Sequence, residues 1–183
     1  HAQIIHFDVD HSSVSKIIEA DIAVFGQVKD SLQAMNAKLK SRLSEINDSK
    51  LDVWRNQIAE WKEMHGLDHD LYKNNSDDSP ILPQAVVQHI YHASNGDAFV
   101  TSDVGQHQMF AAQYYHFDEP RKWINSGGLG TMGFGLPAAM GVKLAYPEEE
   151  VICITGEGSI QMCIQELSTC TQYKLPIKIF NIN

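Results

Sequence analysis

The chain has 183 residues, of which 43% are hydrophobic and 20% are charged, and this balance excludes wholesale disorder. Its 14 Lys and Arg residues against 23 Asp and Glu residues give a formal charge of −9, so few cations are available to bind the phosphates of a nucleic acid. No apolar run approaches the ~18 residues that cross a bilayer, and three cysteines without C-x-x-C spacing fit a reducing compartment. We therefore expect a cytoplasmic protein without nucleic-acid or membrane partners.

The two ends of the sequence are those expected of an internal piece of a longer protein. The first residue is His1 rather than Met, and the last residue, Asn183, directly follows an apolar run at 177–182. That run is typical of a central strand, and a chain seldom ends inside one. We therefore expect further sequence on both sides.

An alternating stretch at residues 3–10, which ends in acids, and a short apolar run at 22–25 predict two short strands. Apolar residues then recur every three or four positions, which predicts a helix capped by Asp30 or Ser31. These residues are Leu32, Met35, Leu39, Leu43 and Ile46.

A second helical repeat precedes a polar segment that is rich in turn-forming residues. The repeat consists of Trp54, Ile58, Trp61 and Met64 or His65. Residues 74–80 are mostly Asn, Asp and Ser and end in proline, which makes them the best predicted domain boundary in the chain.

Beyond residue 80 the pattern becomes an alternation of helices and strands. Pro83 suits the first turn of a helix that Gly96 would end. Strands are predicted at 98–101, 151–155 and 177–182, and helices near 106–117, 134–145 and 160–173. This alternation predicts an α/β fold with a doubly wound parallel sheet, in which ligands bind beyond the carboxyl ends of the strands. Cys163 and Cys170, seven residues apart, are expected to share one helical face in the core.

The clearest local signal follows the strand at 151–155, where Gly156, Glu157, Gly158 and Ser159 lead into a helix. Free backbone N–H groups at such a turn attract anions, yet Glu157 would repel a bare phosphate. A divalent cation between carboxylate and diphosphate removes the contradiction, because Mg²⁺ prefers hard oxygen ligands. The alternative is an ordinary strand–helix turn with a solvated glutamate.

Two further loops carry candidate ligand-binding residues. Residues 127–135 contain five glycines, an entropic cost that is explained if a ligand or another backbone segment approaches closely. In that loop Met132 could be a core residue or a hydrophobic wall for a cofactor. Gln106 and His107, which follow the strand at 98–101, are donors suited to phosphate oxygens, although His107 could simply be a satisfied polar residue.

Three strings together resemble a known family. They are Asp103-Val104-Gly105-Gln106-His107-Gln108-Met109, the run from Trp123 to Ala139, and Gly156-Glu157-Gly158-Ser159-Ile160-Gln161-Met162 followed by Ile164-Gln165-Glu166-Leu167. The sequence is similar to the large, catalytic subunits of acetolactate synthase, which are thiamine diphosphate (ThDP) enzymes. The similarity covers nearly the whole chain and is most specific from Asp103 onward.

The resemblance implies a domain layout and a set of cofactor contacts. Residues 1–40 would be the tail of a central α/β domain that binds FAD, 41–80 a helical linker, and 81–183 the first, truncated part of the ThDP diphosphate-binding domain. The implied ThDP-binding residues are Gln106, His107, Gly130, Thr131, Met132, Glu157, Gly158 and Ser159, with Glu157 also binding Mg²⁺. The implied FAD-binding residues are Asp8, Val9, Gln27 and Val28.

The resemblance also implies an activity, and two departures bear on it. The implied enzyme decarboxylates pyruvate and condenses the product with a second 2-keto acid in branched-chain amino-acid biosynthesis, as a homodimer or homotetramer with a small regulatory subunit. Glu157 and Gln27 stand where the family has aspartate. No catalytic residue falls within the chain, and a second metal-binding Asn would follow Asn183, so we expect the chain alone to be inactive. The alternatives are another ThDP-dependent decarboxylase, carboligase or oxidase, and a non-catalytic fragment with a ThDP-binding fold.

Overall fold

The computed structural model describes residues 2–45, 48–67, 71 and 80–182. The chain divides into two compact units, His1–Met64 and His65–Asn183, which are described separately. The predicted boundary segment, 74–80, lies almost entirely outside the described residues. Within the described part of the chain, no helix combines the length and apolar character needed to cross a membrane.

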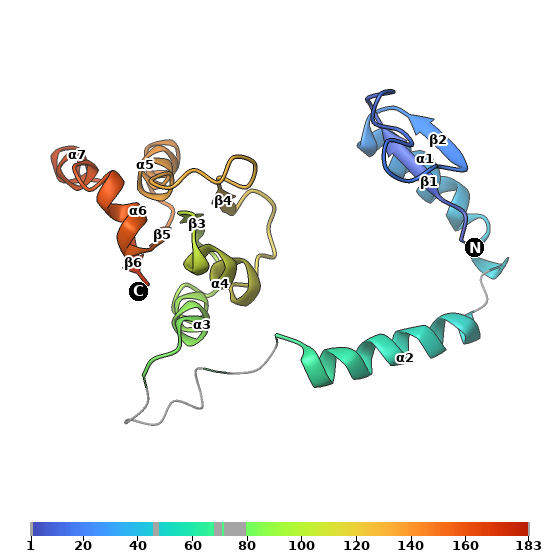
Figure 1. Ribbon diagram of the computed structural model, residues 1–183, viewed down its shortest axis with the longest axis horizontal. Helices are drawn as coiled ribbons and strands as arrows, with labels where there is room; N and C mark the ends of the chain where they lie inside the picture. Colours follow the sequence, from blue (N-terminus) through green and yellow to red (C-terminus); the bar gives the residue numbers. More distant parts are fainter. Residues whose placement is uncertain (1, 46–47, 68–70, 72–79, 183) are drawn as a thin grey trace. The chain divides into compact units, whose positions relative to one another are not determined.

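The first unit is a small parallel β-pair with its helices. Strands β1 (Ile5–Asp8) and β2 (Ile22–Phe25) pair in parallel, with Asp8 opposite Phe25. They are followed by α1 (Val28–Lys40), a short 3₁₀ turn η1 (Leu43–Glu45) and α2 (Asp48–His65), all visible in Figure 1. The two predicted strands and the second predicted helix are therefore confirmed.

The first predicted helix differs from the structure at both ends. Gln27, rather than Asp30 or Ser31, occupies the N-cap position, and Asp30 lies in the first turn, where its charge favours the helix dipole. The helix stops at Lys40, and at the C-cap the Ser41 hydroxyl donates to the Lys38 carbonyl over 2.7 Å. The prediction of one continuous helical face as far as Leu43 and Ile46 was wrong for Leu43, and Ile46 lies outside the described residues.

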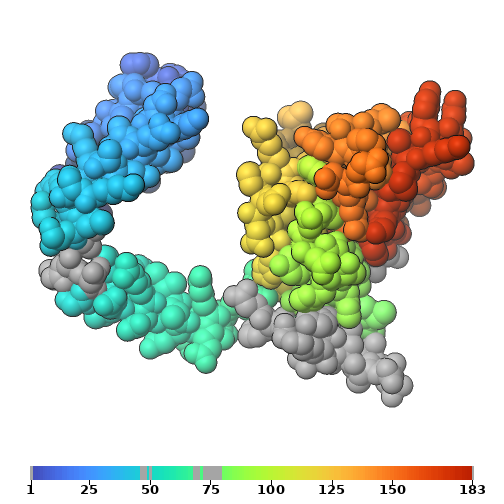
Figure 2. Space-filling view, turned by 180° about the vertical axis from the view of Figure 1, so that it is seen from behind, coloured from blue at the N-terminus to red at the C-terminus, as the bar shows by residue number. Residues whose placement is uncertain are grey.

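The second unit is a four-stranded parallel sheet with helices on both faces. Its strands are β3 (Phe99–Ser102), β4 (Trp123–Asn125), β5 (Val151–Thr155) and β6 (Lys178–Asn181), in the spatial order β4-β3-β5-β6. Its helices are α3 (Pro83–Ala93), α4 (Gln106–Tyr114), α5 (Gly135–Ala145), α6 (Glu157–Met162) and α7 (Glu166–Tyr173). Segments far apart in the sequence, coloured from green to red in Figure 2, form one body.

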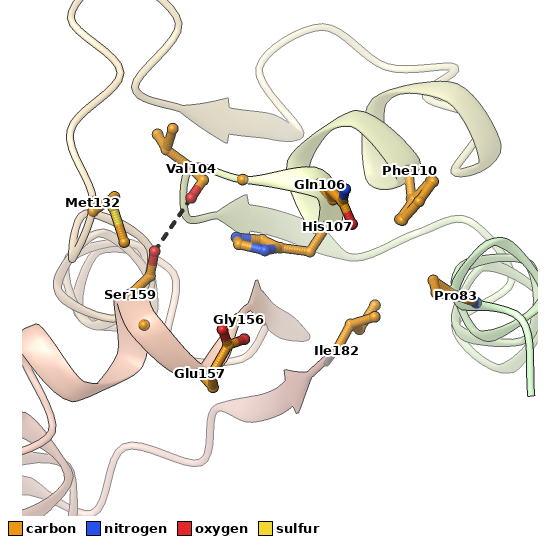
Figure 3. A pocket seen from close by; sticks show the side chains of 12 residues that line it. Pro83, Val104, Gln106, His107, Phe110, Met132, Gly156, Glu157, Ser159 and Ile182 are labelled. Carbon is orange, nitrogen blue, oxygen red and sulfur yellow. Dashed lines mark hydrogen bonds between the residues drawn. The ribbon is translucent and has the colours of Figure 1, made fainter.

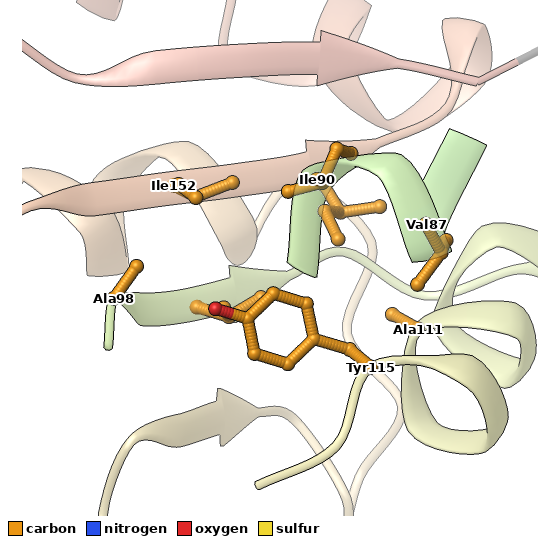
Figure 4. Packing of buried hydrophobic residues seen from close by; sticks show 8 residues of the cluster. Val87, Ile90, Ala98, Ala111, Tyr115 and Ile152 are labelled. Atoms are coloured by element: carbon orange, nitrogen blue, oxygen red, sulfur yellow. The ribbon is translucent and has the colours of Figure 1, made fainter. Parts of the chain in front are cut away.

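Alternate residues of β5 supply the two halves of the core. Ile152 and Ile154 pack with α3 and α4, and Figure 4 shows Val87, Ile90, Ala111 and Tyr115 gathered over this face of the sheet. On the opposite face the buried cluster is Leu136, Ala139, Val151, Cys153, Cys163 and Cys170. Because successive residues of a strand point to opposite faces, a strand covered on both sides is apolar throughout. The doubly wound α/β fold is thus confirmed.

Two features of this unit differ from the expectation. Strand β4 was not predicted, and the single helix expected at 160–173 is two helices separated at 163–165. Cys163, at φ −135°, leaves the helical path and turns into the core. Cys163 and Cys170 therefore lie in one core cluster, as predicted, but not on one continuous helix.

Candidate functional site

A cleft of about 380 Å³ lies at the carboxyl ends of β3 and β5. From β3 the chain crosses to β4 on one side, while β5 lies on the other side of β3. This is the topological switch point of the sheet, where the loops after neighbouring strands diverge and leave a crevice. Figure 3 shows the side chains that converge on it. They are Pro83, Val104, Gln106, His107, Phe110, Met132, Glu157, Ser159 and Ile182, together with Gly105, Gly156 and Gly158.

The structure brings most of the ThDP-binding residues expected from the sequence to this cleft. Gln106 and His107 come from the start of α4, Glu157, Gly158 and Ser159 from the start of α6, and Met132 from the glycine-rich loop. Gly130 and Thr131 do not line the cleft. They form a turn held by Ser126, whose carbonyl accepts from the Gly130 N–H over 2.9 Å and whose hydroxyl accepts from the Thr131 N–H over 3.0 Å.

His107 occupies the middle of the cleft with an unused hydrogen-bonding atom. The residue is 7% exposed, and its buried Nε2 atom has no hydrogen-bond partner among the described residues. Burial lowers the pKa of His107, and the negative charges of Asp103 and Glu157 oppose that shift in part. An imidazole with an unsatisfied buried nitrogen is suited to a ligand that supplies the missing partner.

Glycines allow the imidazole to sit this close to the backbone. A Cβ atom at Gly105 would lie 2.7 Å from Cε1 of His107, and a Cβ atom at Gly156 would lie 2.7 Å from its Nδ1. Gly105 also has φ +155°, which side-chain-bearing residues rarely adopt. The two strand–helix turns are therefore shaped around His107.

Glu157 and Met132 form the other side of the cleft. The Glu157 side chain is exposed and its carboxylate is directed toward His107 (Figure 3). Met132 is 41% exposed, and its Cε atom lies 3.4 Å from where a Cβ of Gly158 would stand. Met132 thus lies over the turn that carries Glu157 and forms an apolar wall of the cleft.

The electrostatics of the cleft suit a cation shared with an anion. Among the described residues, no three His, Cys, Asp or Glu side chains gather into a ready-made metal site. Glu157 would therefore have to share a divalent ion with oxygens from a ligand, which is how Mg²⁺ is commonly bound beside phosphates.

A buried hydrogen-bond network beneath the cleft was not predicted from the sequence. The Asp103 carboxyl group accepts hydrogen bonds from the Gly135 N–H over 2.8 Å and from the Thr155 hydroxyl over 2.6 Å. The Ser159 hydroxyl donates to the Val104 carbonyl over 3.3 Å, drawn as a dashed line in Figure 3. The position of an acid two residues after a predicted strand, 98–101, was the available signal for Asp103.

The expected FAD-binding residues all belong to the first unit. Asp8 ends β1 and Val9 follows it, while Gln27 and Val28 lie at the start of α1 just after β2. The Gly26 N–H donates to the Asp8 carbonyl over 3.1 Å. The four residues therefore meet at the carboxyl edge of the parallel β1–β2 pair.

Comparisons with known proteins show which families the chain is similar to. Residues 103–183 match the family described as "Thiamine pyrophosphate enzyme, C-terminal TPP binding domain". The chain is 50% identical over 182 residues to the acetolactate synthase isozyme 3 large subunit of Escherichia coli and 55% identical to the acetolactate synthase large subunit of Buchnera aphidicola subsp. Schlechtendalia chinensis. It is 41% identical over 184 residues to the chloroplastic acetolactate synthase of Arabidopsis thaliana.

These matches take in the whole chain but only part of each relative. The chain spans 31% of the two bacterial proteins and 26% of the plant protein. The identity extends across both structural units, and the family match begins at Asp103, the residue beneath the cleft. The chain is therefore similar throughout to acetolactate synthase large subunits, and residues 103–183 match the family model of the thiamine pyrophosphate enzymes.

Proposed function

We propose that this chain is part of an acetolactate synthase and that its cleft binds the diphosphate of ThDP through Mg²⁺. The observation that carries the proposal is the pairing of an unsatisfied buried nitrogen, Nε2 of His107, with the Glu157 carboxylate across one cleft. A diphosphate would give the imidazole a partner, and a divalent cation would join that diphosphate to the carboxylate.

Different residues of the chain would bind different parts of the cofactor. Gln106 and His107 would contact the diphosphate, and Glu157, Gly158 and Ser159 would hold Mg²⁺ and the phosphate oxygens. The backbone from Gly130 to Met132, fixed by Ser126, would support the aminopyrimidine ring, and the Met132 side chain would support the bent cofactor. When bound, ThDP supplies the carbanion stabilisation that allows a 2-keto acid to lose carbon dioxide.

The proposed reaction takes pyruvate and a second 2-keto acid. Decarboxylation of pyruvate and condensation with the second acid would give 2-acetolactate or 2-aceto-2-hydroxybutyrate in branched-chain amino-acid biosynthesis. Position and exclusion of water are the contributions that this chain can make, because a fixed cofactor geometry lowers the entropic part of the barrier. We expect no catalysis from these residues alone, since the chain spans 31% of its bacterial relatives.

The rest of the assembly is proposed on the same grounds. Residues 1–40 would complete an FAD-binding domain, with Asp8, Val9, Gln27 and Val28 at its ligand edge, and 41–80 would link it to the ThDP domain. The complete enzyme would be a cytoplasmic homodimer or homotetramer with a small regulatory subunit. Gln27, in place of an aspartate, would give the FAD a neutral amide contact.

Calorimetry and product analysis test the proposal on the complete enzyme. We expect heat of ThDP binding that requires Mg²⁺ and formation of acetolactate from pyruvate. A different product from pyruvate would assign another ThDP-dependent activity. Absence of any metal-dependent heat would refute the cofactor site and favour a non-catalytic fold, an alternative that Glu157 makes worth testing.

A further inference from the structure

Asp103 is a completely buried acid that does not line the cleft. It follows β3 directly, is 0% exposed, and has both carboxyl oxygens engaged by hydrogen bonds. One oxygen accepts from the Gly135 N–H and the other from the Thr155 hydroxyl. A buried carboxyl group is costly unless it is hydrogen-bonded, and these two hydrogen bonds meet that requirement.

Its two partners belong to the two other loops of the cleft. Gly135 closes the glycine-rich loop that carries Met132, and Thr155 is the last residue of β5, two positions before Glu157. Asp103 itself begins the loop that carries His107. Asp103 therefore lies in one of the three segments that supply the proposed cofactor contacts and hydrogen-bonds the residues that border the other two.

The backbone at Gly135 also lies very close to Asp103. A Cβ atom at Gly135 would lie 2.8 Å from the Asp103 backbone nitrogen and 2.9 Å from its carboxyl carbon. The Gly135 carbonyl accepts from the Thr101 hydroxyl over 2.9 Å, so Gly135 is held to β3 on both sides. This contact leaves the glycine-rich loop little freedom to move relative to β3.

We propose that Asp103 is a positioning residue that fixes the three loops of the cofactor cleft relative to one another. This inference rests on the proposed function, because its expected consequence is a change in cofactor affinity. Residues that orient metal-binding groups from behind typically change affinity about 10–100-fold when they are removed. Asp103 would act in this way on the turn that carries Glu157.

Two substitutions of Asp103 separate positioning from simple packing. Asp103→Ala leaves the Gly135 N–H and the Thr155 hydroxyl without their acceptor. Asp103→Asn can keep a hydrogen bond to both partners, because its amide oxygen can accept from the Gly135 N–H and its amide nitrogen can donate to the Thr155 hydroxyl oxygen. Thr155 can then donate to the Gly156 carbonyl, which lies 3.3 Å from its hydroxyl.

The experiment uses the complete enzyme and two readouts. Calorimetry measures the Mg²⁺-dependent affinity for ThDP, and hydrogen exchange without cofactor measures protection of the Gly135 amide and of residues 156–159. We expect Asp103→Ala to weaken ThDP binding by about 10-fold or more and to speed exchange in both loops. We expect Asp103→Asn to restore both properties, and Val87→Ala, a core change away from the cleft, to lower stability without changing affinity.

The outcomes distinguish this inference from the proposed function. If the wild-type enzyme binds no ThDP, the proposed function fails, while the exchange contrast between the Ala and Asn variants still decides the role of Asp103. Unchanged loop exchange or unchanged affinity in Asp103→Ala would overturn the inference, as would an Asn variant as impaired as the Ala variant. Should Asp103→Ala fail to fold, Thr155→Val removes only the hydrogen bond between Thr155 and Asp103. Amide hydrogen exchange should then speed up at residues 156–159 but not at Gly135.

Discussion

Replacing Gly135 with alanine should destabilise the second unit, although alanine is the better helix former. Gly135 is the first residue of α5, and its φ is not in the left-handed region, so conformational freedom does not explain the glycine. The new methyl group would lie 2.8 Å from the Asp103 backbone nitrogen. Backbone cannot turn away as a flexible side chain can, so α5 or the end of β3 must shift.

The magnitude follows from three effects of this substitution. Forcing an extra methyl group into a filled space costs about 1–3 kcal/mol. A shift of the helix start also weakens the hydrogen bond from Gly135 to the Asp103 carboxyl group, a type worth about 1.5–3 kcal/mol. The gain in helix propensity returns at most about 1 kcal/mol. We therefore expect a loss of about 2–4 kcal/mol in the free energy of unfolding.

Gly141 provides a matched control in the same helix. A Cβ at Gly141 would meet no heavy atom of the described residues within 4 Å, so Gly141→Ala should stabilise the protein by about 0.5–1 kcal/mol. Urea denaturation followed by circular dichroism measures both variants. A Gly135→Ala protein as stable as wild type, or one that moves in the same direction as Gly141→Ala, would refute the close-contact argument.

Three further predictions concern the cleft and the core. Glu157→Asp withdraws the carboxylate by the length of one C–C bond, ~1.5 Å. We expect calorimetry to show tighter Mg²⁺-dependent ThDP binding, because aspartate is the acid that the family has at this position. Unchanged affinity would contradict the assignment of Glu157 to the metal. Burial lowers the pKa of His107 below its ordinary value of 6.5, so the unfolded state binds the proton more readily and the free energy of unfolding should fall as the pH drops below about 6.5. Denaturation at pH 8 and pH 5 should show a smaller loss of stability in His107→Gln than in the wild type. An equal loss in the two proteins would count against the shift. Burial raises the pKa of Cys153 to about 12, so a thiol reagent at pH 8 should modify Cys153 only after denaturant exposes it, and rapid labelling of the folded protein would argue against this packing.

Strong local patterns explain which elements could be predicted. Residues 151–154 form an uninterrupted apolar run that Thr155 ends, and β5 spans 151–155 with both faces of the strand covered. Strand β4, only Trp123–Asn125, is too short to show a periodic pattern and exists through its parallel pairing with β3. The break between α6 and α7 likewise has no local signal, because it depends on Cys163 finding space in the core.

The sequence by itself determined the α/β alternation, the two strand–helix turns and the residue types suited to a phosphate and a cation. It also placed those residues after strands, which is enough to predict that they share one edge of a parallel sheet. Only the tertiary structure decided that β3 and β5 are neighbours, that His107 is left with an unsatisfied nitrogen, and that Asp103 joins three loops. The physical reason is that strand order and burial depend on contacts between residues far apart in the sequence, such as Asp103 with Gly135, 32 positions away, and with Thr155, 52 positions away. Local spacing carries no information about such contacts.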